Sequence, residues 1–340
     1  MKFTEAKKNA ILSYLLEKIG NGEESVSKKV ADNFEINQNT VHTYINELID
    51  SGLVKRKSRD CYELVSNCIK YNLSRKKGEI DDEHRAFKKY LFNEINQYAA
   101  NVIEIWEYAF EEMFNNVIDH STSEKCIIEI RKDASKTAIW IADDGIGIFD
   151  NIRDYFKLHS IEDAVEELFK GKVTTNATYH SGEGIFFTSR MMDEFIIISS
   201  GKIFHIDKYD ESILFDNPLK NKKGTALYMS LSNESNKAAK DIFDKYADSE
   251  GGFEKTSIKL KNIYDSSPIS RSQAKRLCAG LDKFSEVELD FTDMEWMGQG
   301  FAHQIFKVWA KAHPEVRIVP KGMNKDVQKM YNHVVKTTRN

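Results

Sequence analysis

Proline and cysteine are both scarce in this chain, and their placement is informative. Only four prolines occur, and all of them lie at or beyond residue 218, so the first two thirds of the chain are free of the strongest helix breaker. The four cysteines form no CxxC pair and have no histidines at zinc-site spacing. This pattern favours free thiols in a reducing compartment, and we expect a cytoplasmic protein.

Long apolar runs and a strong net charge are also missing. No stretch approaches the roughly 20 apolar residues needed to cross a bilayer, and the first residues mix charged and apolar side chains instead of forming a signal peptide. We therefore expect no membrane partner. The formal net charge is only −4 for 340 residues, so any contact with nucleic acid must come from a local patch.

Residues 1–68 have the element order of a winged helix-turn-helix. Apolar residues recur at helical spacing after Thr4, again in 25–35 and again in 37–54. The third helix presents short polar side chains of the kind that read base edges, namely Gln38, Thr40, His42, Thr43 and Asn46. The spacing therefore predicts a DNA-recognition helix.

A strand, a tight wing and a second strand follow that helix. They carry a dense basic cluster that is suited to phosphates, formed by Lys55, Arg56, Lys57 and Arg59. We interpret 1–68 as a DNA-binding domain. The other interpretation is a small dimerisation domain with a solvated basic loop.

Residues 69–99 are strongly charged and predict a helical connector. Their only histidine, His84, lies in no recognisable phosphoacceptor motif. We interpret it as a surface residue.

The next segment predicts one long helix with a polar stripe. Glu112, Asn116 and His120 are spaced at i, i+4 and i+8, which aligns them along one face. Buried polar groups need partners, so the stripe indicates either a ligand site or a solvated face. The helix alone does not decide between the two.

Two predicted strands then lead into a glycine-rich bend, Asp143-Asp144-Gly145-Ile146-Gly147. A carboxylate at a strand end can accept a hydrogen bond from an exocyclic amine, and glycines let a flat base approach the backbone. Taken alone this motif is weak, because Asp-Gly pairs also mark ordinary turns.

Two further glycine motifs come later in the chain. Gly182-Glu183-Gly184 opens a predicted helix, whose first backbone N–H groups form an anion site. Gly224-Thr225 begins a late strand. We expect 155–181 to be a mobile lid without clear periodicity, with Lys170, Lys172 and His180 as candidate phosphate contacts.

The four motifs, in this order, resemble the GHKL ATPases, a superfamily with the Bergerat fold that includes DNA gyrase and the histidine kinases. The resemblance covers roughly 100–232 and implies that ATP and Mg²⁺ are the cofactors. It implies Asn116 as the Mg²⁺ ligand, Asp143 as the carboxylate that reads adenine, and Thr225 as its hydroxyl support. It places Glu112 where hydrolysing members have their general base. The remaining cofactor-binding residues that we expect are His120, Gly145, Gly147, Lys172, Gly182 and Gly184.

The last segment, 265–340, alternates helices and strands and predicts a small open sheet. It resembles the STAS domains of anti-sigma antagonists and a STAS-like family that is often fused to GHKL domains. Those antagonists carry a phosphorylatable Ser or Thr at a strand-to-helix corner. Here the corner from Glu295 to Gly300 has no hydroxyl, so we expect a docking module for a protein partner and no phosphotransfer to it.

We thus expect a multidomain α+β protein: a winged helix at 1–68, a helical connector at 69–99, a GHKL ATP-binding domain of Bergerat α/β sandwich type at 100–232, a linker at 233–264 and a STAS-like α/β domain at 265–340. The first functional hypothesis is an ATP-responsive, DNA-binding transcription regulator with slow Mg-dependent ATP hydrolysis, acting as a homodimer. One alternative is an anti-sigma-type serine/threonine protein kinase with a separate substrate protein. Another is an ATP-gated effector in stress or phage defence.

Overall fold

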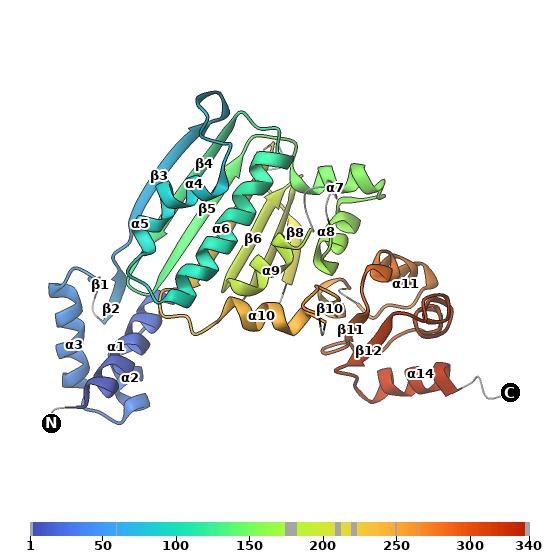
Figure 1. The fold of residues 1–340 in the computed structure, drawn as a ribbon. Coiled ribbons are helices and arrows are strands. Elements are labelled where there is room, and N and C mark those ends of the chain that lie inside the picture. Colours follow the sequence, from blue (N-terminus) through green and yellow to red (C-terminus); the bar gives the residue numbers. More distant parts are fainter. Residues whose placement is uncertain are drawn as a thin grey trace.

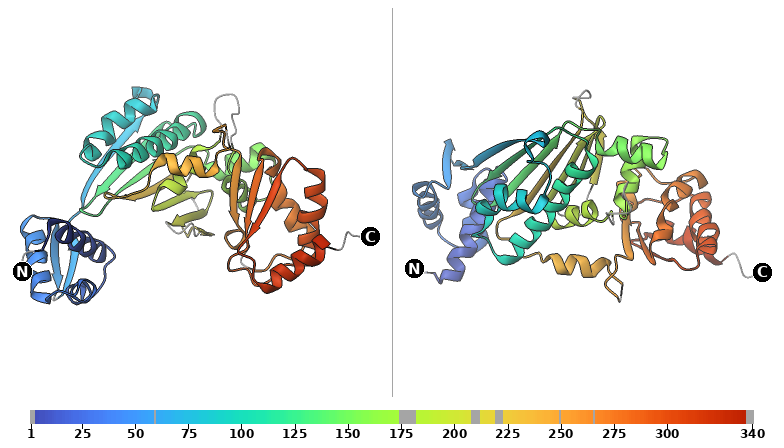
Figure 2. Two further views of the ribbon diagram at one scale, coloured as in Figure 1. Left: turned by 60° about the horizontal axis from the view of Figure 1, so that its bottom comes forward. Right: turned by 45° about the horizontal axis from the view of Figure 1, so that its top comes forward.

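The computed structural model describes residues 3–58, 60–173, 182–207, 212–218, 223–248, 250–264 and 266–336. Three units follow one another along the chain (Figure 1), and the N-terminal and C-terminal units lie at opposite ends of a large central sheet (Figure 2). In the described part of the chain, no helix combines the length and the apolar character that crossing a bilayer requires. The protein is a mixed α/β structure with several sheets.

The N-terminal unit consists of three helices and a two-stranded antiparallel hairpin. Its elements are α1 (Glu5–Gly20), α2 (Val26–Phe34), α3 (Gln38–Asp50), β1 (Val54–Ser58) and β2 (Cys61–Leu64). The Thr4 hydroxyl accepts from the backbone N–H of Lys7 and caps α1. The apolar faces of the three helices form a core of their own, separate from the core of the rest of the chain. This unit is therefore packed as an independent domain.

The central unit is a seven-stranded antiparallel sheet of order β3-β4-β5-β9-β6-β7-β8. The strands are β3 (Asn67–Ser74), β4 (Lys125–Lys132), β5 (Lys136–Asp143), β6 (Glu194–Ser199), β7 (Lys202–Asp207), β8 (Ser212–Asp216) and β9 (Thr225–Ser232). Burial alternates along β4 and β6, with residues such as Ile128 and Phe195 directed into the core. One face of the sheet is therefore covered.

Helices cover this face of the central sheet (Figures 1 and 2). They are α4 (Glu83–Ala86), the π-turn Phe87–Leu91, α5 (Phe92–Ile95), α6 (Ala100–His120), α7 (Ile148–Phe156), α8 (Ile161–Lys170), α9 (Gly184–Met191) and α10 (Ala239–Tyr246). The long helix α6 buries one face against the sheet, including Trp106, Phe110 and Phe114. His84 is on the surface, with 60% of its side chain exposed, and pairs with Glu111 at 2.6 Å.

The C-terminal unit is a three-stranded parallel sheet flanked by helices. Its elements are β10 (Lys255–Lys259), a 3₁₀ turn at Leu260–Asn262, α11 (Arg271–Cys278), a 3₁₀ turn at Leu281–Lys283, β11 (Glu286–Asp290), α12 (Gln299–His303), a π-turn at Gln304–Trp309, α13 (Ala310–Ala312), β12 (Arg317–Lys321) and α14 (Lys325–Lys336). A capping box between Ser270 and Gln273 starts α11. The core of this unit is continuous with that of the central unit.

Three segments differ from what the sequence predicts. The predicted connector begins with β3, an edge strand with polar residues that pairs only with β4. The predicted linker at 233–264 contains α10 and also β10, the edge strand of the C-terminal sheet. The predicted lid contains α8, whose three apolar residues at Ala164, Val165 and Leu168 are buried but are surrounded in sequence by acidic ones.

Candidate functional site

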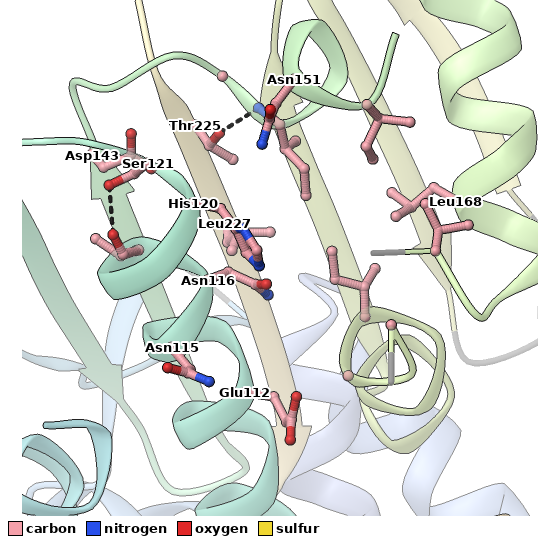
Figure 3. A pocket seen from close by; sticks show the side chains of 18 residues that line it. Glu112, Asn115, Asn116, His120, Ser121, Asp143, Asn151, Leu168, Thr225 and Leu227 are labelled. Atoms are coloured by element: carbon pink, nitrogen blue, oxygen red, sulfur yellow. Dashed lines mark hydrogen bonds between the residues drawn. The ribbon is translucent and has the colours of Figure 1, made fainter. Parts of the chain in front are cut away.

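Most of the residues singled out in the central sequence segment line one cavity of about 290 Å³. It lies between α6, the ends of β5 and β9, and helices α7, α8 and α9 (Figure 3). Its lining comprises Glu112, Asn115, Asn116, Val117, His120, Ser121, Asp143, Gly147, Ile148, Asn151, Ile152, Leu168, Val173, Gly182, Gly184, Ile185, Thr225 and Leu227. The volume is close to the lower limit of small-molecule sites, which is about 300 Å³.

Helix α6 supplies the polar stripe of the cavity. Glu112, Asn116 and His120 follow one another along the helix and line the cavity (Figure 3). The opposite face of α6 is buried in the core, which fixes the rotation of the helix and therefore the direction of the stripe. Of the two interpretations that the i, i+4, i+8 spacing left open, the structure has the stripe facing a cavity and not bulk solvent.

Asp143 is the last residue of β5 and is only 8% exposed. Its Oδ1 accepts from the backbone N–H of Gly145 at 2.7 Å. Burial raises the pKa of this carboxyl, and hydrogen bonds from the backbone of Gly145 and Thr225 oppose that rise. The carboxylate is therefore held in one place, at the rim of an enclosed space, by backbone groups.

Thr225 begins β9, which pairs antiparallel with β5, so it lies at the same end of the sheet as Asp143. Its hydroxyl accepts from the backbone N–H of Ile148 at 3.0 Å (Figure 3). The direct link to Asp143 comes from the Thr225 backbone and not from its hydroxyl. The side chain thus anchors the first turn of α7, a role that the sequence did not predict.

Three of the four predicted glycines line the cavity, and none of these three has room for a side chain. Gly147 has a φ of +91°, and a Cβ there would lie 2.8 Å from the Ser199 hydroxyl. A Cβ at Gly184, the first residue of α9, would collide with the Glu112 carboxylate. Gly145 is not among the lining residues, and a Cβ there would collide with the Ser121 carbonyl.

The lysine expected to contact phosphate lies elsewhere. Lys172 is not among the described residues that line the cavity. Its Nζ pairs with Glu254 at 2.7 Å and donates to the Lys283 carbonyl at 2.9 Å, both in the C-terminal third of the chain. Lys170 is also turned away, toward α11. His180 lies outside the described residues.

Sequence reasoning missed part of the lining. Asn115 and Asn151 bring two more amides to the cavity, but a single asparagine within a helix gives no distinctive signal. The apolar wall contributed by α7 and α8, including Ile148, Ile152 and Leu168, was missed because those helices were not predicted. The helical spacing of a few apolar residues within a short, acidic segment is the signal that could have found it.

The cavity has an unbalanced charge. Glu112 and Asp143 are acidic, whereas no lysine or arginine occurs among the lining residues that the structure describes. An anionic ligand would therefore need a bound cation or backbone N–H groups. The first turn of α9 offers such N–H groups beside Gly184.

A second candidate surface lies on the N-terminal unit. Thr43 and Asn46 are exposed on α3, whereas Thr40 and His42 are half-buried. In the hairpin, Lys55, Arg56 and Lys57 are exposed, and Glu63 lies 2.6 Å from Lys55 and 4.0 Å from Lys57. Arg59 lies outside the described residues. Helix α3 is on the side of this unit that faces away from the central sheet (Figure 1).

Comparison with known proteins identifies one part of the chain. Residues 273–328 match a family model described as a STAS-like domain of unknown function, DUF4325. No curated protein matches the chain. The match covers α11, β11, α12 and β12, which is the order of helices and strands that the sequence predicts there. The C-terminal unit therefore contains a STAS-like domain.

Proposed function

We propose that the central unit binds Mg-ATP in the manner of the GHKL ATPases. The observation that supports this most strongly is the convergence of four distant sequence motifs, represented by Asn116, Asp143, Gly184 and Thr225, on a single cavity. Each motif is common by itself. Their meeting at one end of the sheet, with the order and spacing of that superfamily, is what favours a nucleotide as the ligand.

Each polar group has a role in this proposal. Asp143 accepts a hydrogen bond from the adenine amine, because it is a largely buried acceptor that a backbone N–H holds in place on the cavity wall. Asn116 supplies an oxygen ligand to Mg²⁺, a hard cation that prefers oxygen. The phosphates meet the N–H groups at the start of α9. Since the lining has two carboxylates and no described cation, Mg²⁺ is needed to offset the charge of the phosphates.

Glu112 is the candidate general base for hydrolysis. It lies on the same helical stripe as Asn116 and one turn before it, so its carboxylate is close to where the metal and the terminal phosphate would lie. A carboxylate acts as a base only when it is within hydrogen-bond reach of the attacking water. Turnover is therefore a property to be measured.

The experiment is ATP binding and phosphate release, with Mg²⁺, by the wild type, Glu112→Ala and Asp143→Ala. Glu111→Ala is the matched control, because Glu111 is the neighbouring acid on α6 but pairs with His84 at 2.6 Å. We expect Asp143→Ala to lose binding and Glu112→Ala to bind without turnover. Wild-type binding without turnover would indicate a nucleotide sensor, and no binding by the wild type would refute the proposal.

We further propose that the N-terminal unit binds DNA and that its affinity responds to the nucleotide. This unit contacts the far ends of β5 and β9: the Ser13 hydroxyl donates to Glu234 at 2.6 Å, and Gly20 packs against Ser135. The same two strands carry Asp143 and Thr225 at their other ends. A ligand shifts an equilibrium only if it binds one state better. Equal DNA affinity with and without ATP, at fixed salt, would refute this coupling.

A further inference from the structure

Helix α8 lies between the nucleotide cavity and the STAS-like domain. It contacts α7 and α9 in the central unit and β10 in the STAS-like sheet. Leu168 on α8 lines the cavity, while Lys170 at its C-terminal end reaches α11. Figure 1 shows α8 above β10 and beside α11. Any movement of α8 therefore changes the cavity wall and the domain contact together.

Lys170 is the central contact of this arrangement. Its side chain is only 2% exposed, and its Nζ donates to the Glu167 carboxylate at 2.5 Å. The same Nζ donates to the Arg276 carbonyl at 3.0 Å and the Ala279 carbonyl at 2.9 Å, at the C-terminal end of α11. The Arg276 carbonyl also accepts from the backbone N–H of Ala279 at 3.2 Å, and the helix dipole favours a cation at this end of α11. The buried ammonium thus donates two of its three hydrogen bonds to the STAS-like domain.

The backbone at the end of α8 is also held by the STAS-like sheet. The hydroxyl of Thr256, in β10 and only 2% exposed, donates to the Lys170 carbonyl at 2.8 Å. One residue further on, a Cβ at Gly171 would lie 2.9 Å from the Phe186 ring of α9 and 2.8 Å from the Phe253 ring that precedes β10. The end of α8 is therefore closely packed between α9 and the segment that precedes β10.

The cores of the two units support the same conclusion. Buried residues of the STAS-like domain, such as Leu277 and Phe284, belong to the hydrophobic cluster that also contains Phe186 and Leu168. The N-terminal unit, by contrast, has a separate cluster. Of the two end units, the STAS-like domain is therefore the one whose hydrophobic core is continuous with that of the central unit.

We propose that the STAS-like domain regulates the nucleotide cavity by holding α8 in place through a latch formed by Lys170, Thr256 and the end of α11. This inference rests on the proposed function, because it names the regulation of the same site. While the latch is made, Leu168 stays on the cavity wall and nucleotide leaves slowly. A partner that draws the STAS-like domain away breaks the latch, and nucleotide exchange becomes faster.

The polar character of the latch favours regulation over simple stability. A buried ion pair is weak evidence for stability, since apolar residues of similar volume often serve as well. Polar contacts to carbonyls, however, can be exchanged for water when two surfaces separate. Coupling between sites is reciprocal, so bound nucleotide should strengthen the contact between α8 and the STAS-like domain.

The test uses the full chain with Mg²⁺ and a fluorescent ATP analogue, and measures the rate at which the analogue dissociates. Lys170→Met removes the ammonium but keeps an unbranched apolar side chain as far as Cε. Thr256→Val removes only the hydroxyl, from a strand that does not line the cavity, and Thr256→Ser restores it. Lys132→Met is the matched control. Lys132 lies on β4, away from the latch, and its ammonium likewise contacts a carboxylate and a backbone carbonyl, both of Glu94.

We expect dissociation to be about tenfold faster or more in Lys170→Met, since charged hydrogen bonds are lost, and a few-fold faster in Thr256→Val. The wild type, Thr256→Ser and Lys132→Met should agree. Amide exchange in 161–170 should rise in the same two variants, and added nucleotide should reduce it in the wild type. If dissociation and amide exchange are unchanged in Thr256→Val and Lys170→Met, the proposed latch is overturned and the proposed function is not. A wild type that binds no analogue would overturn the proposed function, and the regulation with it.

Discussion

The carboxylate of Glu112 occupies the space that a side chain at Gly184 would need. An ideal Cβ at Gly184 would lie less than 3.0 Å from the Glu112 carboxylate, which is closer than Cβ atoms approach other heavy atoms in proteins. Glu112 belongs to α6 and Gly184 begins α9, so two helices far apart in sequence meet at this point. The negative carboxylate lies at the N-terminal end of α9, where the helix dipole stabilises it.

Gly184→Ala should therefore displace Glu112 and disturb the start of α9. We expect nucleotide affinity to fall about tenfold or more, because a misplaced anion site loses at least one charged hydrogen bond. Binding of an ATP analogue, measured together with the melting temperature, checks this. Gly252→Ala is the control, since the nearest atom to a Cβ there is 3.6 Å away. Normal binding by Gly184→Ala would mean that α9 does not contact the phosphates.

Thr225→Val should loosen the first turn of α7. The change removes the hydroxyl that accepts from the Ile148 N–H at 3.0 Å, and an unsatisfied N–H costs about 1–3 kcal/mol. We expect a lower melting temperature and weaker nucleotide binding, because Ile148, Asn151 and Ile152 line the cavity. Thr225→Ser keeps the hydroxyl and should restore both. If the valine variant binds normally, the hydroxyl has no part in shaping the site.

The raised pKa of Glu166, on α8, predicts that the stability of the protein depends on pH. Burial raises its pKa from 4.5 to about 7, and Asp163 and Glu167 add to the rise while Lys170 and Arg276 oppose it. Since the folded state has the higher pKa, the stability that Glu166 contributes is complete below pH 4.5 and is lost as the pH rises through about 7.

Glu166→Gln removes that titration. Between pH 5.5 and pH 8 the wild type should lose about 2 kcal/mol more stability than the variant, given the two pKa values. Melting temperatures of both proteins at the two pH values measure the difference. Parallel changes with pH in the two proteins would show that Glu166 is not buried in solution as it is here.

The hairpin lysines should govern any binding to DNA. Lys55→Ala with Lys57→Ala removes two exposed charges, so the slope of log affinity against log salt should fall by about 2 if both contact phosphates. Glu63→Gln should have the opposite effect on affinity, because Glu63 competes for both lysines. Lys76→Ala with Lys77→Ala is a control of equal charge outside the N-terminal unit. An unchanged slope in the hairpin variant would favour the dimerisation interpretation.

Local patterns in the sequence were enough to define the elements with strong periodicity. The helix carrying Glu112 and Asn116, the strand that ends at Asp143 and the helix that begins at Gly184 all occur as the sequence predicts. Each follows from a local rule: an uninterrupted apolar stripe, an alternating strand, or a glycine at a helix start. The C-terminal segment was likewise predicted as alternating helices and strands, because its helices are amphipathic and its strands β11 and β12 are short segments that contain β-branched or alternating apolar residues.

Tertiary packing, in contrast, set which residues face the cavity and which face another domain. Lys170 and Lys172 are cations of the kind that contact phosphates. In the fold, however, the central and STAS-like units share one core, and both ammonium groups bind carbonyls of the C-terminal third. In the same way β10 is too short and polar to predict alone, and becomes a strand because it pairs with β11. The sequence does not show where a lysine side chain points. Packing decides this, because a buried ammonium must lie where hydrogen-bond acceptors are available.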